Sequence, residues 1–322
     1  MKIVTFIRNW ILIFAILAGI GGYFLYAAIP ALDGTHETAM SVISLLQPLL
    51  IFAMLFLTFC KVDARDLRLT RWHAWLIAIQ AGLFLAIGAV VMMLPSSGLR
   101  IILEGAMICF ICPVATASAV ITRKLGGSAS SITTYTILIN LVVALLIPAV
   151  LPFVHPSASM TAFKASMLIL SKVMPLLLAP LLLAFAIKRF APRLCDMLTS
   201  CKDLAFYLWV VALTLATAVT TRIIVHSDVE LYVALWLVAV TLVSCLAQFL
   251  LGWKIGGRYG DRITAGQALG QKNTVLAIWM GYTFFTPITA VTGGFYSIFH
   301  NLINSWQLAR ARHDSEKNQN PS

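Results

Sequence analysis

The chain has 322 residues, of which 60% are hydrophobic and only 11% are charged, and its formal net charge is +11. Apolar runs of about 20 residues, the length that crosses about 30 Å of hydrocarbon, recur along the whole chain. The polar segments between them are too short to form a soluble catalytic domain. The composition therefore predicts an all-α polytopic membrane protein whose function lies within the membrane.

The apolar runs predict ten transmembrane helices, followed by a polar, disordered cytoplasmic tail at 310–322. The expected spans are 10–29, 40–59, 72–94, 101–122, 129–152, 165–187, 204–222, 230–253, 263–285 and 287–308. The first span also resembles a secretory signal peptide, but its apolar run is longer than a usual signal core. Removing it would leave nine spans and spoil the charge alternation described next.

The basic residues alternate between the two sides of these spans. Eighteen of the 23 Lys and Arg residues fall on one side: Lys2, Arg8, Lys61, Arg65, Arg68, Arg71, Arg123, Lys124, Lys188, Arg189, Arg193, Lys202, Lys254, Arg258, Arg262, Arg310, Arg312 and Lys317. Only Arg100, Lys164 and Arg222 fall on the other. By the positive-inside rule both termini are expected in the cytoplasm, and a bacterial inner membrane is the expected location. The distribution of basic residues is thus explained by membrane topology, and nucleic acid is not expected as a partner. The expected partner is the lipid bilayer, and no protein partner is predicted.

Five spans precede the loop around His155 and Pro156, and five follow it. An odd number per half makes the second half (155–309) an inverted copy of the first (1–154). Each half contains one span interrupted by small and polar residues, "CPVATASAVIT" at 112–122 and "GQALGQKNT" at 266–274. Pro113 removes a backbone donor, and Gly266 and Gly270 are expected to loosen the other helix. Unwound backbone is tolerated in a membrane only where protein buries it or it lines a cavity, so these segments form the predicted site.

At these two segments the chain resembles the bile acid:sodium symporter family, which includes bacterial homologues of the apical sodium-dependent bile acid transporter. "CPVATASAVIT" is similar to the motif C-P-G-G-T-A-S-N-V of the family's fourth helix, and "GQKNTVLA" to the motif E-x-G-x-Q-N-x-x-L-A of its ninth. The resemblance implies ten helices, with a panel domain (helices 1, 2, 6 and 7) and a core domain (the other six). It also implies that broken helices 4 and 9 cross in the core and bind organic anions beside two sodium ions.

The resemblance carries over to some of the family's site residues. Thr116 and Ser118 match the family's Thr and its sodium-binding Ser, so Ser118 is a candidate for both substrate and ion. Thr136 and Gln80 match sodium-ligand positions on the fifth and third helices. Other ligand positions are lost, because Ala119 and Ile132 stand where the family has Asn and Ser.

Two registers are open for the ninth-helix motif. Anchored on Gly270 and Asn273, the first puts Ala268 at the family's sodium-binding Glu and Lys272 at its sodium-binding Gln. The second pairs Gln267 and Gln271 with that Glu and Gln. Neither register restores a carboxylate, and a lysine offers no acceptor to a hard cation that prefers oxygen ligands. We therefore expect a degraded sodium site and no metal ion, with a sodium-coupled symporter of altered sites as the alternative.

Lys272 lies about ten residues, or roughly 15 Å, into its span, too deep for easy snorkelling to the interface. The hypothesis is that its ammonium replaces a sodium ion and, with Thr116, Ser118 and Asn273, holds an anionic substrate. The group could gain a proton as the anion binds, so proton coupling is also open. Two further ionisable residues are candidates inside spans. Glu104 could pair with a lysine or relay protons, and Lys172 could line the cavity or reach the outer boundary.

Enzyme signatures are missing from the sequence, which contains no H-E-x-x-H, G-x-S-x-G or G-x-x-x-x-G-K-[ST] motif. The C-x-x-C pair Cys109 and Cys112 lies in an apolar run without a second cluster, so packing is favoured over a metal or redox role. We therefore expect no enzyme and no cofactor. The favoured function is a sodium-independent secondary transporter of small organic anions (carboxylates or sulfonates) by alternating access. A non-transporting membrane sensor on the same fold is the alternative from another class.

Overall fold

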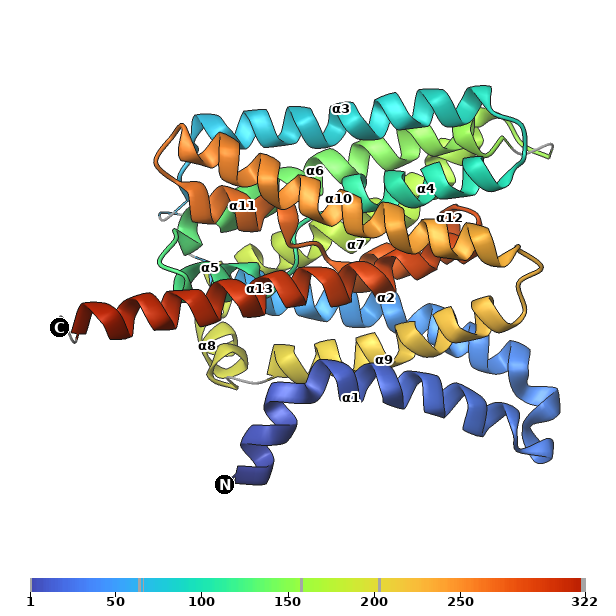
Figure 1. Cartoon of the computed structure of the whole chain (residues 1–322), viewed down its shortest axis with the longest axis horizontal. Coiled ribbons are helices and arrows are strands. Elements are labelled where there is room, and N and C mark those ends of the chain that lie inside the picture. The colour runs from blue at the N-terminus through green and yellow to red at the C-terminus, as the bar shows by residue number, and fades with distance from the viewer. Residues whose placement is uncertain (1, 63–64, 66, 157–158, 202–203, 320–322) are drawn as a thin grey trace.

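The structure, a computed structural model, describes residues 2–62, 65, 67–156, 159–201 and 204–319, and over these ranges the chain is almost entirely helical (Figure 1). In chain order the elements are α1 (Lys2–Ala27), η1 (Pro30–Thr35), α2 (His36–Cys60), α3 (Arg71–Met93), α4 (Gly98–Ile111), α5 (Ser118–Lys124), α6 (Ala129–Val154), α7 (Ala162–Phe190), α8 (Pro192–Ser200), α9 (Leu204–Val225), α10 (Leu231–Gly257), α11 (Arg262–Gly270), α12 (Thr274–Phe284), η3 (Pro287–Thr289) and α13 (Ala290–Gln319).

Six of the described helices, α2, α3, α6, α7, α9 and α10, are long and apolar enough to cross a membrane. An apolar helix satisfies its backbone hydrogen bonds internally, as a segment in hydrocarbon must. Large hydrophobic side chains are also exposed along these helices, for example Leu182 on α7 and Leu235 on α10. The fold is that of an all-helical, polytopic integral membrane protein.

The C-terminal segment differs from the sequence expectation. Residues 310–319, predicted as a disordered tail, continue α13 to Gln319. The physical reason is local, because Ala, Arg, Glu, Lys and Gln in this stretch are favourable helix formers once a preceding helix supplies the nucleus.

Lys202 and residues 320–322, which were assigned to the cytoplasmic side, lie outside the described residues. The short helix α8 was not anticipated; Pro192 occupies its first position, where a missing N–H costs nothing.

The helices pack in two groups. In one group α1 and α2 pack on α9, and α2 also packs on α7. In the other, α10 packs on α4, α11 and α13, α3 packs on α4 and α6, and α12 packs on α13. The two groups meet where α6 packs on α7 and where α12 contacts α2 and α9.

The connections divide between two ends of the molecule (Figure 1). The connections α2–α3, α5–α6, α7–α8 and α10–α11 lie together with the C-terminus at one end. We call it the basic end, because most of the basic residues of the larger set lie in these connections or in the helix turns beside them. The connections α1–α2, α3–α4 and α9–α10 lie at the opposite end. The charge asymmetry read from the sequence is therefore also a spatial asymmetry.

Candidate functional site

The two interrupted segments meet in the interior of the second helix group. α4 ends at Ile111 and α5 begins at Ser118, while α11 ends at Gly270 and α12 begins at Thr274. Between them, Val114 and Lys272 form an isolated antiparallel bridge. The Ala115 N–H donates to the Gln271 carbonyl at 3.0 Å, and the Asn273 N–H donates to the Pro113 carbonyl at 2.9 Å. Two segments that lie about 160 residues apart in the chain thus supply each other's missing backbone partners.

Side chains satisfy the helix ends that the crossing leaves open. The Gln80 side-chain amide on α3 donates to the carbonyls of Ile111 (3.3 Å) and Cys112 (3.1 Å). The Tyr296 hydroxyl on α13 donates to the Gly270 carbonyl at 2.9 Å. The Cys112 thiol donates across the crossing to the Asn273 carbonyl at 2.9 Å. The last carbonyls of a helix need such partners when they are buried, so these groups hold the breaks open in one geometry.

The glycines of the ninth predicted span act differently from the expectation. Gly266 and Gly270 lie inside α11, and the non-helical residues are 271–273. A Cβ added to Gly266 would lie 2.1 Å from Trp253 Cδ1, and one added to Gly270 would lie 2.4 Å from Phe249 Cγ. Their role is therefore close packing of α11 against aromatic rings of α10, rather than loosening of the helix.

Three consecutive residues of the crossing each bury a polar atom without a partner. The exposed fractions of Gln271, Lys272 and Asn273 are 3%, 1% and 6%. No hydrogen bond to Gln271 Oε1, Lys272 Nζ or Asn273 Nδ2 is made by the described residues. A buried polar atom without a partner costs about 1–3 kcal/mol, and more if it is charged. Three in a row indicate a place built to receive a polar ligand or water.

The Lys272 side chain is enclosed by protein, as its depth in the span predicted. Its ammonium lies within electrostatic range of the thiols of Cys109, Cys112 and Cys245. No acidic residue of the described chain forms an ion pair with it, since the ion pairs among the described residues all involve Glu104. The Lys272 side chain therefore does not extend to the membrane interface. Within the described residues its charge has no counter-ion.

The other predicted substrate residues lie in or beside the crossing, with different exposure. Thr116 is half-buried and Ala117 is exposed, so the connection that leads into α5 is open on one side. Ser118, the first residue of α5, is buried. Asn273 caps α12, because its Oδ1 accepts from the Leu276 N–H at 3.2 Å. An N-cap asparagine fits the start of a helix, and the cap explains why this residue type stands at the break.

Of the ion-coupling candidates, Gln80 and Thr136 already have protein partners. Gln80 Oε1 accepts from the Tyr135 hydroxyl at 3.0 Å, while its amide holds the end of α4 as described above. The Thr136 hydroxyl donates to the Ile132 carbonyl within α6 at 2.8 Å. Gln267 is drawn away from the crossing, because its amide donates to Asn304 Oδ1 on α13 at 3.0 Å. Of the pair in the second register, only Gln271 lies at the crossing.

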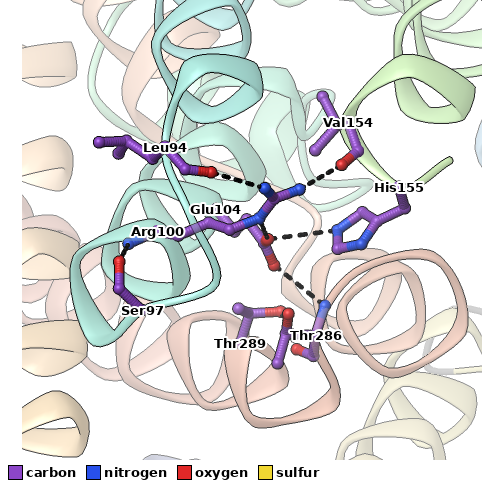
Figure 2. Close-up of polar contacts among 8 residues, drawn as sticks. All are labelled: Leu94, Ser97, Arg100, Glu104, Val154, His155, Thr286 and Thr289. Carbon is purple, nitrogen blue, oxygen red and sulfur yellow. Dashed lines mark hydrogen bonds and ion pairs between the residues drawn. The ribbon is translucent and has the colours of Figure 1, made fainter.

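Glu104 lies in the middle of α4, seven residues before the break, in a buried network of its own (Figure 2). Its partner is an arginine rather than a lysine, with Arg100 Nε 3.3 Å from Glu104 Oε1. The His155 ring also lies 3.3 Å from that oxygen, and the Thr286 N–H donates to Oε2 at 3.1 Å. Arg100 donates in addition to the carbonyls of Leu94 (3.0 Å) and Val154. The carboxylate therefore ties α4 to the end of α6 and to the connection between α12 and η3.

Sequence reasoning did not single out Tyr296, although it did indicate a contact between helices for Gln248. Tyr296 had no distinguishing signal, because a lone tyrosine in an apolar helix is typical of a residue that only packs against its neighbours. Gln248 had one, since a polar side chain alone in an apolar run predicts a contact between helices. Its amide donates to the Cys109 carbonyl at 3.1 Å and contacts the Tyr296 hydroxyl at 3.0 Å. Lys172, in contrast, is exposed on α7 and does not reach this interior.

No family model matches the chain, and no curated protein matches its sequence significantly. Among the described residues no cluster of three His, Cys, Asp or Glu side chains is arranged to hold a metal ion. The class of the molecule, a polytopic helical membrane protein, thus rests on its own helices, and its function has to be argued from the crossing.

Proposed function

We propose that this chain is a secondary transporter of small organic anions, of the carboxylate or sulfonate type. The observation that carries the proposal is the row of three buried residues, Gln271, Lys272 and Asn273, each with an unpartnered polar atom at the crossing of two interrupted helices. The proposal includes the resemblance noted above: ten spans in two inverted halves, related in architecture to the bile acid:sodium symporters.

The charge at the crossing favours an anion as the ligand. Lys272 has no acidic partner in the described chain, and a charge buried without a partner is costly. An anion placed beside it would supply that partner. The start of α12 adds to this preference, since the N-terminus of a helix carries a partial positive charge. A sodium ion fits less well, because Ala268 offers no side-chain oxygen and the side-chain oxygen of Gln80 already accepts a hydrogen bond from Tyr135.

Transport requires that the site open to each side in turn. The two packing groups supply a division along which this can happen, and Thr116 and Ala117 lie on the open side of the crossing. In the proposed mechanism the groups rock against each other around the crossing, which moves little. No motif for ATP binding is found in the sequence, so the gradient of the substrate or of a coupled ion would drive the cycle.

The test is counterflow in proteoliposomes loaded with an unlabelled anion. Candidate anions come first from a thermal-shift screen of carboxylates and sulfonates with and without sodium, because a ligand stabilises the folded state that binds it. We expect accumulation of label without sodium, and its loss in Thr116→Trp, which fills the open side of the crossing. Binding without counterflow would indicate the sensor instead. Stimulation by sodium would indicate a sodium-coupled symporter with altered sites.

A further inference from the structure

A cavity of about 260 Å³ lies between α1, α2 and α9, at the end of the molecule opposite the basic end. It belongs to the first helix group and is separate from the crossing. Along α1 it runs from Ala18 to Tyr26, a length of roughly 12 Å at 1.5 Å per residue. We propose that this groove binds one acyl chain of an anionic phospholipid, with the lipid phosphate at Arg222.

The groove exists because two glycines of α1 act in different ways. A Cβ on Gly19 would lie 2.5 Å from the Thr214 carbonyl oxygen, so this glycine allows α1 and α9 to approach closely. A Cβ on Gly22, one turn further, would meet nothing within 4 Å. Both residues line the cavity. The space beside Gly22 is therefore room that no protein side chain fills.

The lining is graded from apolar to polar along the groove. Its inner part is lined by small and aliphatic side chains such as Ala18, Ile43 and Leu215. Its end near the helix termini is lined by Tyr26, His36 and Arg222, which belong to three different helices. An occupant of matching polarity has an apolar body and a polar head. Leu17 and Leu25, on the neighbouring surface of α1, are 57% and 70% exposed, so the groove borders the face that a bilayer covers.

The charge of the occupant's polar head is inferred from Arg222. This half-buried guanidinium makes no ion pair and no side-chain hydrogen bond within the part of the chain that the structure describes. It lines both this cavity and a second one of about 310 Å³ that reaches Thr286. The acidic residues Asp228 and Glu230 of the adjacent connection line neither cavity. A phosphate matches an arginine well, because the guanidinium fork donates two parallel hydrogen bonds to it.

Neighbouring groups leave the guanidinium accessible. The Tyr23 hydroxyl lies 3.4 Å from His226 Nδ1, which also lies 3.0 Å from the Arg222 carbonyl, so this pair bridges α1 and the end of α9 without using the Arg222 side chain. The Tyr26 hydroxyl lies 2.5 Å from Thr35 Oγ1, and its ring packs edge-on against His36 at 5.1 Å. The polar rim is thus fixed by contacts within the protein, and the arginine remains available for a ligand.

The experiment is native mass spectrometry of the detergent-solubilised full chain, titrated with phosphatidylglycerol and with phosphatidylcholine of the same acyl chains. We expect one binding event in which phosphatidylglycerol is favoured at least about tenfold, because both lipids carry the phosphate but the choline ammonium of phosphatidylcholine cancels its charge and is repelled by Arg222. Arg222→Gln should remove that preference. Lys164→Gln, which removes an exposed charge predicted for the same side, should keep it.

A second pair of variants tests the groove itself. Gly22→Leu should abolish the event for both lipids because its side chain fills the space. Gly21→Leu, at the neighbouring position where a Cβ also meets nothing within 4 Å but which does not line the cavity, should behave as the unmodified protein. Ala39→Leu fills the groove from α2 and serves if Gly22→Leu does not fold. Equal binding of the two lipids by the unmodified protein, equal losses in Arg222→Gln and Lys164→Gln, or undiminished binding in the folded filled variant would each overturn the proposal.

Discussion

Two lysines within the predicted spans form a natural pair for testing the role of a buried charge. Lys272 is 1% exposed at the crossing, whereas Lys172 is exposed on α7. We expect Lys272→Gln to weaken anion binding at least about tenfold, because it removes the cation that lies at the crossing beside the proposed ligand. Lys172→Gln should change the dissociation constant by less than about twofold. Isothermal titration of both variants, with and without sodium, measures the effect.

Sodium should not rescue Lys272→Gln, since Ala268 still supplies no side-chain oxygen. Full transport by Lys272→Ala in sodium-free buffer, or uptake by the unmodified protein that sodium stimulates, would contradict the role given to this ammonium.

Glu104 is the other ionisable group whose environment the structure defines at residue scale. We expect Glu104→Gln to lower the free energy of unfolding by about 2 kcal/mol, because it leaves the buried side of Arg100 and the His155 ring without their anionic partner. Thermal unfolding followed by a thiol-reactive fluorophore measures this. Glu37→Gln, at an exposed position of α2, is the control and should stay within about 0.5 kcal/mol. An unchanged midpoint for Glu104→Gln would show that the network adds no stability.

At the scale of elements, the packing of α11 on α10 depends on glycine. Gly270→Ala should destabilise the fold by about 1–3 kcal/mol, the usual cost of overpacking, because its Cβ meets the Phe249 ring. Gly257→Ala, where the Cβ meets nothing within 4 Å, should be neutral or slightly stabilising. Thermal midpoints of the purified variants compare them. If Phe249→Leu partly restores Gly270→Ala, the ring is the obstacle; equal midpoints for the two glycine variants would refute this packing role.

The sequence predicted the positions of the two helix breaks better than the contacts that stabilise them. Pro113 and the polar residues after Gly270 are local signals, because a missing donor or a buried lysine is visible in the chain itself. The contacts that stabilise the breaks are not local: Gln80, Tyr296 and the Cys112 thiol reach them from other helices or across the crossing. The same limit explains Gln267, whose partner Asn304 lies on α13. Which residue of a polar pair faces the crossing is decided by tertiary packing.

At the scale of the whole molecule, the grouping of basic connections at one end predicts a fixed orientation in the membrane. We expect reporter fusions after residues 36 and 318 to lie in opposite compartments, with the second in the cytoplasm. Position 36 begins α2 at the end opposite the basic end, and position 318 lies near the end of α13. A phosphatase and a fluorescent protein, active on different sides, report the two compartments. The same compartment for both fusions would exclude the ten-span arrangement.

The reciprocal pairing at the crossing also has a consequence for biosynthesis. While only the first 154 residues have left the ribosome, the Ala115 N–H and the Pro113 carbonyl have no partners, because these are supplied by Gln271 and Asn273. We therefore expect the interruption of the first half to stay without its protein partners until α11 and α12 are in place. The amides of Ala115 and Asn273 should accordingly become protected from exchange with solvent together, as the last step of maturation, and a chain truncated after residue 154 should be degraded.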